Sequence, residues 1–516
     1  MRFLTTILIL LLFFSLPGTF VCAMNNDSSD KRIEEKSDDW GSENDEEGWG
    51  EDDEDEGWND ESEDEDWGES DSGGDSDEEE FVAGNDYGTK EKKRSKLIPK
   101  VKLPFQGFLR LTVSNHLTTK SKPKNLSSAQ LALELEYDKK FARDFRLHFV
   151  GQVFHDFVYE LEQRGNYHGT ELDKLESGGK LKELWLSYSQ DSYDLYIGRQ
   201  IVVWGESDGL AITDLINPRD RSLLFFQTLE ESRLGVNMAR FNYYWGENTL
   251  SLITIGEFRP NKMAVEGTEF DFRPDLLKSF SILPFNFMIG DHIKPEIGSR
   301  PEWGIRVMMP GEGYDVSFMA ASLFDDDFVL SPSPNGVINM AHNRFDMYGF
   351  TANKLVEKFV FKIEAAYYHG KAYNRINPIS PMLITPGNFL IVEDRDVINI
   401  AAGFDLTFND NLSILFNQQY QLILNYDDYL LTDREILLTF VNFSFSFLND
   451  TLKPSYTLFF LANGKDFIHK IAFEYQTEAG LSLSAGMDIV MPLSTDSTMS
   501  NYEDTSRVWG EIKNNF

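Results

Sequence analysis

The sequence predicts an all-β protein: a transmembrane, antiparallel, up-and-down β-barrel of about 18 strands, with 16 as the alternative count, preceded by a disordered acidic segment. Three observations support this fold class. Apolar and polar residues alternate along most of the chain after Pro104, short connections alternate with mostly longer ones, and the N-terminus carries an export signal. No later run of apolar residues is long enough to cross a bilayer as a helix.

Residues 1–23 have the features of a secretory signal peptide. A basic residue precedes an apolar run from about Ile7 to Leu16, Pro17-Gly18 breaks the run, and Val21-Cys22-Ala23 provides a cleavage site. The run is too short for a membrane-anchoring helix. Lipid attachment at Cys22 is an alternative, which the bulky Val21 disfavours. Because the chain holds a single cysteine, we expect no disulfide in the mature protein.

Residues 24–97 form a separate acidic region and a basic linker. Most of the net charge of -37 is located here, because residues 27–86 hold 30 acidic side chains and three basic ones. Tryptophan recurs every nine residues, and one such residue per unit cannot bury enough surface to offset the entropy of ordering, so we expect disorder. We expect this tail in the periplasm, as a solvated spacer or as a weak binder of divalent cations or of a basic partner.

Residues 98–516 show the two-residue period of strands with one apolar face. In Phe145–Phe149, Phe359–Ala365 and Val441–Phe447 the odd positions are apolar and most even positions are polar. A soluble β-sandwich is the structural alternative, but it would expose polar faces to water, and 41 phenylalanines are too many for a solvated surface. The apolar faces therefore indicate contact with outer-membrane lipid.

The spacing of the strands predicts the orientation of the barrel. Eight short connections alternate with nine mostly longer ones, as in outer-membrane barrels of Gram-negative bacteria, where short turns face the periplasm and long loops face outward. Both termini then lie on the periplasmic side. The final residue, Phe516, resembles the terminal aromatic that the barrel-assembly machinery reads. The short connections fall near residues 138–144, 190–193, 245–248, 310–313, 354–357, 408–411, 448–451 and 477–480.

The most distinctive stretch ends a strand-like run and opens the third long connection, with Gly198-Arg199-Gln200, Trp204-Gly205-Glu206 and Asn217-Pro218-Arg219-Asp220. This stretch of about 25 residues resembles a family of porin-like outer-membrane proteins of largely unassigned function, which is similar in design to the alginate-export porins; the likeness in barrel layout extends from about Pro104 to Phe516. The resemblance implies a passive channel or exporter and fixes no solute.

We expect residues 205–228 to fold into the bore and narrow it, because irregular backbone inside a barrel is tolerated where it lines water or is buried by protein. The alternative is that the charges of this loop only tie it to the wall. The residues predicted to form the constriction are Arg199, Glu206, Asp208, Asp214, Arg219, Asp220 and Arg221. The residues predicted to face the lumen are Arg146, His148, Arg233, Asn237, Arg306, Arg344, Lys362 and Glu364.

The sequence gives no indication of an enzyme, a cofactor or a metal site. The eight histidines are scattered without zinc-ligand spacing, and no phosphate-binding glycine loop or nucleophile elbow is present. A serine hydrolase assembled from distant residues stays an alternative. The negative charge disfavours nucleic-acid binding. Two functions are therefore considered: a channel for hydrophilic solutes, and a plugged structural or adhesion barrel whose tail or loops bind partners.

Overall fold

The computed structural model separates the chain into two units at Lys96 and Leu97. It describes residues 105–516 except 119–125, 163–171, 208–211, 299, 380–382, 464, 478–479, 495–496 and 498. The expectations for the signal peptide, the acidic tail and the basic linker lie outside the described residues.

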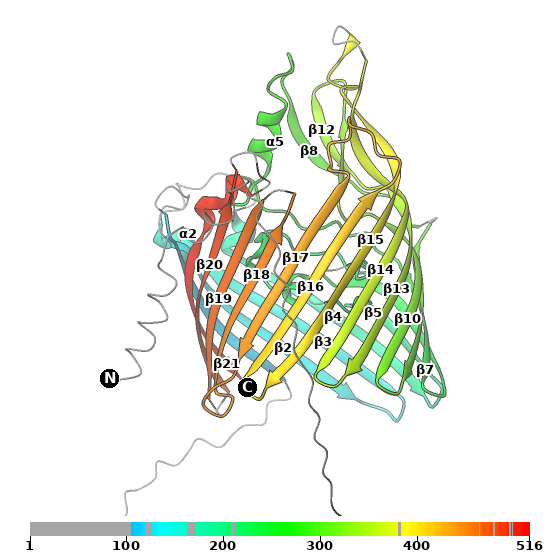
Figure 1. Ribbon diagram of the computed structural model, residues 1–516, viewed down its shortest axis with the longest axis vertical. Coiled ribbons are helices and arrows are strands. Elements are labelled where there is room, and N and C mark those ends of the chain that lie inside the picture. Colours follow the sequence, from blue (N-terminus) through cyan, green and yellow to red (C-terminus); the bar gives the residue numbers. More distant parts are fainter. Residues whose placement is uncertain are drawn as a thin grey trace, which may run out of the picture. The chain divides into compact units, whose positions relative to one another are not determined.

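The second unit is a closed β-barrel (Figure 1). Eighteen strands form one sheet in which every neighbouring pair is antiparallel, and the first strand pairs with both the second and the last, so the sheet has no free edge. The predicted count of 18 is confirmed. The wall strands are β1 (Gln106–His116), β2 (Leu126–Lys140), β3 (Phe145–Asp156), β4 (Ser177–Gln190), β5 (Tyr193–Gln200), β6 (Val236–Trp245), β7 (Asn248–Ile255), β9 (Glu302–Gly311), β10 (Tyr314–Phe324), β13 (Arg344–Val356), β14 (Phe359–Ile376), β15 (Leu390–Asn409), β16 (Leu412–Ile423), β17 (Glu435–Phe445), β18 (Leu452–Leu461), β19 (Asp466–Gln476), β20 (Leu481–Pro492) and β21 (Arg507–Asn515).

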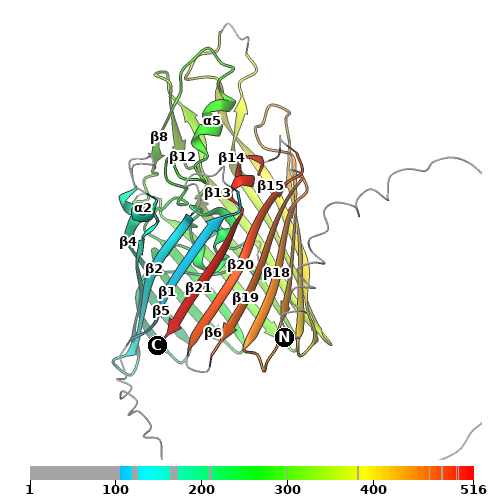
Figure 2. The same ribbon diagram turned by 90° about the vertical axis from the view of Figure 1, so that its left-hand side faces the viewer.

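Short turns gather at one end of the barrel and long loops at the other (Figures 1 and 2). We call the loops used below loop 3 (residues 201–235), loop 4 (256–301) and loop 5 (325–343). None of the helices in the described part of the chain is long and apolar enough to cross a membrane. The helices, all in the loops, are α2 (Val158–Leu161), α3 (Asp173–Glu176), η2 (Leu224–Phe226), α4 (Leu229–Ser232), α5 (Arg273–Ser279) and η4 (Ser500–Thr505).

The outer face of the wall is apolar. On β1, Leu109, Leu111 and Val113 are 38–44% exposed, whereas Ser114 and His116, which alternate with them, are buried. Exposed apolar residues recur in the same way on most of the other wall strands, which would leave a large apolar surface in water. The barrel therefore has the surface of a membrane-spanning protein.

Aromatic rings mark the outer wall near the short-turn end. Phe145 on β3 lies 5.0 Å from its cross-strand partner Tyr188 on β4, measured between ring centroids, and Tyr193 on β5 lies 5.8 Å from Phe241 on β6. Aromatic side chains in this position suit the boundary between lipid tails and head groups, because a ring has an apolar body and a polarisable edge.

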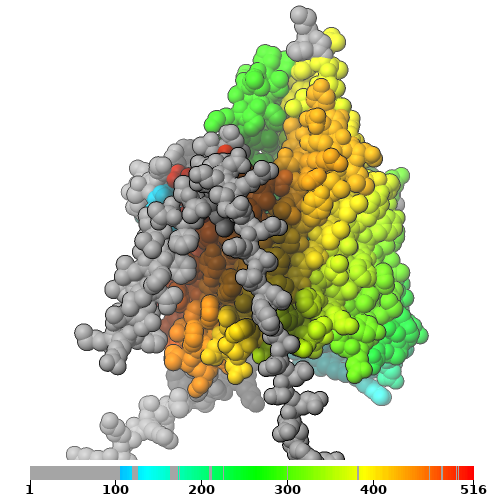
Figure 3. Space-filling view, in the orientation of Figure 1, coloured from blue at the N-terminus to red at the C-terminus, as the bar shows by residue number. Residues whose placement is uncertain are grey.

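A small subdomain stands above the long-loop end, and its green and yellow segments project beyond the wall in Figure 3. It contains a three-stranded sheet of β8 (Met288–Ile293), β12 (Val337–Ala341) and β11 (Val329–Pro332), in which β8 and β12 run parallel. Its own apolar core includes Phe280, Ile338 and Phe389. Loops 4 and 5 and the connection after β14 are thereby held together by packing.

Candidate functional site in the barrel interior

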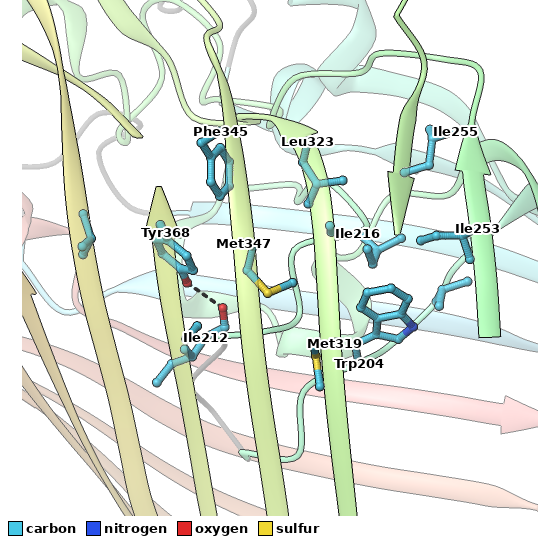
Figure 4. Packing of buried hydrophobic residues seen from close by; sticks show 14 of the residues in the cluster. Trp204, Ile212, Ile216, Ile253, Ile255, Met319, Leu323, Phe345, Met347 and Tyr368 are labelled. Atoms are coloured by element: carbon cyan, nitrogen blue, oxygen red, sulfur yellow. Dashed lines mark hydrogen bonds between the residues drawn. The ribbon is translucent and has the colours of Figure 1, made fainter. Parts of the chain in front are cut away.

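Loop 3 lies inside the barrel. Its apolar residues Val202, Trp204, Ile212 and Ile216 belong to one buried cluster with residues from seven wall strands, and Figure 4 shows the loop side chains against the strands. Buried side chains of one loop can share a cluster with the inner faces of that many strands only from within the closed wall. The wall residues of this cluster are Val236, Met238, Ile253, Ile255, Met319, Ala321, Leu323, Phe345, Met347, Ala366, Tyr368, Tyr373, Val397, Ala401 and Ile423.

Two glycines in the wall make room for the loop. A Cβ atom on Gly304 of β9 would lie 2.6 Å from Cη2 of Trp204, and one on Gly349 of β13 would lie 2.8 Å from Cγ2 of Thr213. Such distances are far inside van der Waals contact, so a side chain at either position would displace the loop. Trp204 is 2% exposed, which means that its indole is fully enclosed.

Asn217 holds the two ends of loop 3 together. Its side-chain amide donates to the carbonyl oxygens of Gln200 and Leu234, both at 3.0 Å, and its Oδ1 accepts from the backbone N–H of Val202 at 2.7 Å. Gln200 in turn donates to the Met238 carbonyl. The Gly-Arg-Gln and Asn-Pro parts of the motif therefore serve the local structure of the loop, since they satisfy buried backbone groups.

Glu364 on β14 fixes the middle of the loop. Its carboxylate, 0% exposed, accepts hydrogen bonds from the backbone N–H groups of Glu206, Ser207 and Thr213 and from the Thr213 hydroxyl, at 2.5–3.3 Å. Tyr368, which follows Glu364 along the same inner face of β14, donates its hydroxyl to the Ile212 carbonyl. A buried carboxylate satisfied by several donors is a strong and directional anchor.

Two buried aspartates of loop 3 each form ion pairs with two basic side chains. Asp214 Oδ2 lies 3.1 Å from Arg219 and 2.9 Å from Arg233, and Asp220 Oδ2 lies 3.2 Å from Lys180 and 3.0 Å from Lys262. Burial opposes ionisation of Asp220, but Lys262 and Lys180 outweigh it and lower its pKa to about 2. The carboxylate therefore stays charged and paired at neutral pH.

Further ion pairs join loop 3 to the wall and to loop 5. Glu206 lies 3.0 Å from Arg306 on β9 and accepts from the Asn353 amide on β13. Arg221 lies 2.7 Å from Asp327 of loop 5. The predicted alternative, that these charges tie the loop to the wall, thus describes contacts that are present. Asp208 lies outside the described residues.

The distal part of loop 3 reaches a different part of the wall. Glu231 of α4 lies 2.7 Å from Arg110 on β1, and the Phe226 ring lies 3.8 Å from the Arg507 guanidinium on β21. Val202, Trp204, Ile212 and Ile216 belong to the cluster with strands β6 to β16, so loop 3 extends across the barrel interior rather than along one side of it.

The structure places most of the predicted lumen residues on the inner face. Arg306, Lys362 and Glu364 alternate with outward residues such as Trp303, Phe361 and Ile363, and Lys362 pairs with Asp405 at 2.7 Å. Arg146 and His148 lie on the inner face of β3 near the short turn to β2. Arg233 belongs to loop 3 itself.

Three predicted residues point outward, and these predictions are wrong. Asn237 is exposed between Val236 and Met238, which belong to the interior cluster. Arg199 is the cross-strand partner of Asn237 and of the exposed Leu184, and it binds the Gly235 carbonyl and Glu257 on that face.

Arg344 is the third of these residues. It alternates with the buried Phe345 and Met347 of β13 and donates to the carbonyls of Arg300 and Pro301 at the long-loop rim. A shift of one residue in the strand pattern moves every side chain to the other face, and the pattern around these residues is too irregular to fix that parity.

A small cavity of about 60 Å³ lies between loop 3 and loop 5. Burial, together with the neighbouring carboxyls of Glu302 and Asp325, raises the pKa of Asp326 well above its usual value. The sequence prediction did not include the part of the site that loop 5 forms, although the run of three aspartates, Asp325 to Asp327, was a signal for it. The lining residues are Asp214, Leu215, Asn217, Arg219, Arg221, Asn261, Phe324, Asp325, Asp326, Asp327, Phe345, Tyr368 and Lys371.

The closed antiparallel wall, the apolar outer face and the loop folded into the interior define a porin-like membrane β-barrel. The chain belongs to the family described as "Protein of unknown function (DUF1302)", whose model matches residues 124–433. The comparison with curated protein sequences finds no match.

Among solved structures, the barrel is similar to Acinetobacter baumannii OccAB3, with 9% identity, a TM-score of 0.45, and coverage of 80% of this chain and 98% of that one. It is also similar to Pseudomonas aeruginosa OccK8 (OprE), with 10% identity, a TM-score of 0.44, and coverage of 80% and 98%. A third similar structure is Salmonella typhi OmpF in complex with daunomycin, with 10% identity, a TM-score of 0.38, and coverage of 80% of this chain and 97% of that one.

Proposed function

We propose that the protein is an outer-membrane channel of a Gram-negative bacterium that passes hydrophilic solutes and is narrowed by loop 3. The observation that carries this proposal is the position of that loop inside a lipid-facing barrel, where Glu364 and Arg306 of the wall hold it. A fixed loop with charges of both signs can restrict the size and charge of what passes.

The inner face between loop 3 and the short-turn end supports a polar path. Lys182 lies 2.7 Å from Glu134, and Arg110 lies 3.8 Å from Glu511, all on the interior side of β4, β2, β1 and β21. Charged residues on the inside of a barrel and apolar residues on its outside are the arrangement that a water-filled bore requires.

The test is single-channel conductance in planar bilayers. Deletion of residues 205–228 should raise the conductance, because it removes the loop from the interior. Deletion of residues 281–287, which belong to the subdomain above the barrel, is the matched control and should leave it near the wild-type level. Equal conductance of the wild type and the loop 3 deletion would contradict the narrowing role.

A plugged barrel with a structural or adhesion role is the second candidate. The apolar cluster that loop 3 forms with β6 to β16 favours it, since buried apolar side chains rather than polar ones fill this part of the interior. On this reading the intact protein conducts no ions, and only the variant lacking residues 205–228 does. The wild-type trace therefore separates the two candidates.

A further inference from the structure

The β2–β3 hairpin brings together on the lumen face three side chains of the types that ligate metal ions. Glu136 and Asp138 are two residues apart on β2, so they point to the same side, and His148 on β3 is the direct cross-strand partner of Asp138. No spacing rule along the sequence would find this set, because the register of two strands creates it.

The three ligand atoms have a spacing that fits one ion. Nδ1 of His148 lies 3.0 Å from Oδ2 of Asp138 and 4.0 Å from Oε1 of Glu136, and all three atoms lie within 4.8 Å of one another. Metal–ligand bonds of about 2.0–2.2 Å place neighbouring ligand atoms about 3.0–4.3 Å apart. Small side-chain rotations, which move the ligand atoms by a few tenths of an ångström, are therefore enough for all three to contact a common ion.

The histidine ring is positioned by its neighbours. It stacks on Trp185, its cross-strand partner on β4, with 4.7 Å between ring centroids and 23° between planes. The Trp185 indole N–H is itself bound to Glu183 at 2.8 Å. This support fixes the orientation of the ring with Nδ1 toward the two carboxylates, which is the kind of outer contact that tunes metal ligands.

We propose that Glu136, Asp138 and His148 form a binding site for a divalent transition-metal ion in the barrel interior near the short-turn end. One imidazole and two carboxylates suit ions such as Zn²⁺, whereas Ca²⁺ and Mg²⁺ prefer oxygen ligands alone. Three protein ligands leave coordination positions open to water or to a passing anionic solute.

Arg146 competes with the metal for Asp138. Its Nε lies 2.7 Å from Oδ1 and its Nη2 lies 2.5 Å from Oδ2 of the carboxylate. Metal binding takes Oδ2 from the guanidinium, and Oδ1 keeps the bond to Nε. Arg146 thus satisfies Asp138 without the ion and weakens the site through its positive charge.

The experiment is isothermal titration of the full-length chain in detergent with ZnCl₂. Wild type should show a site that is lost, or weakened at least about tenfold, in His148→Gln and in Glu136→Gln. His155→Gln is the matched control, because His155 lies on the same strand but pairs with the outward-facing Leu131, and it should bind as wild type. Circular dichroism verifies that each variant folds.

Arg146→Gln distinguishes a metal site from a purely structural cluster of side chains. Because it frees Asp138 and removes a positive charge, it should tighten Zn²⁺ binding by about tenfold or more. The acidic residues 27–86 give carboxylate-only background, which CaCl₂ titration measures and which the His148→Gln exchange should not alter. Identical Zn²⁺ isotherms for wild type, His148→Gln and Arg146→Gln would overturn the proposal, whatever the conductance of the protein.

Discussion

Thr213 donates both its backbone N–H and its hydroxyl to the same carboxylate oxygen of Glu364, at 2.5 and 2.6 Å. The other oxygen accepts from the N–H groups of Glu206 and Ser207. Two separate points of loop 3 are thus fixed to one side chain of the wall, which explains how a long irregular segment keeps a defined place inside the barrel.

Glu364→Gln should release this part of the loop. The glutamine side chain replaces one acceptor oxygen by an NH₂ group, which cannot accept a hydrogen bond from the loop N–H groups that face it. These buried N–H groups lose their partner, so the free energy of unfolding should fall by about 1–3 kcal/mol. The single-channel conductance should rise or fluctuate between levels as the loop moves. Asp405→Asn, which changes a lumen carboxylate paired with Lys362 on the wall, is the control and should show steady conductance. Steady conductance in both variants would rule out Glu364 as the anchor.

Trp204→Ala should leave a large cavity in the interior cluster, because the indole is enclosed by Gly304 and Ile253. Removal of a buried aromatic side chain costs about 3–5 kcal/mol, which denaturant unfolding in detergent can measure. Trp204→Phe keeps much of the apolar volume and should lose clearly less stability than Trp204→Ala. Equal losses would indicate that the ring is not the packing element.

The wall was predictable from the sequence, and the interior only partly so. The alternation in Phe359–Ala365 predicts both the strand and the inward position of Glu364. One face of the strand contacts lipid and must be apolar, whereas the other faces the interior and can be polar. What Glu364 binds was not predictable, since Thr213 lies 151 residues away in the chain. Near Arg199 the pattern fails because the inward position before it is Gly198, with φ +131°, which carries no side chain to mark the face.

Asp214→Asn should change the ion selectivity of the channel. The substitution leaves Arg219 and Arg233 without their shared carboxylate and makes the interior more positive. The reversal potential in a KCl gradient should shift toward chloride preference, and more so at low ionic strength, where the charges are screened less. Asp433→Asn, an exposed carboxylate in the connection between β16 and β17, should leave the reversal potential unchanged. A shift of the same size in the control would attribute selectivity to surface charge instead.

The subdomain above the barrel should weaken in acid through His292. Nδ1 of His342 donates to the Asp325 carbonyl at 2.7 Å, so its Nε2 is the acceptor for Nδ1 of His292, at 2.9 Å. Burial, with His342, Arg273 and Lys294, lowers the pKa of His292 to about 4 against the opposing pull of Asp291.

Because the folded state favours neutral His292, the stabilisation is complete above the ordinary histidine pKa of about 6.5 and is lost as the pH falls toward 4. The loss should amount to about 1–2 kcal/mol, since partial exposure screens the charge. Hydrogen exchange of the β8 amides, corrected for intrinsic rates, should show falling protection between pH 6.5 and 4. His292→Gln removes this titrating group and should make the fall in protection clearly shallower, and His342, whose pKa burial also lowers, accounts for the part that remains. If the variant and the wild type show the same slope, the acid response belongs to His342, whose pKa burial lowers, or to Asp327, where burial is outweighed by Arg221 and Lys371, which lower the pKa. Asp325 also faces His342, but burial raises its pKa, so its titration would act in the opposite direction.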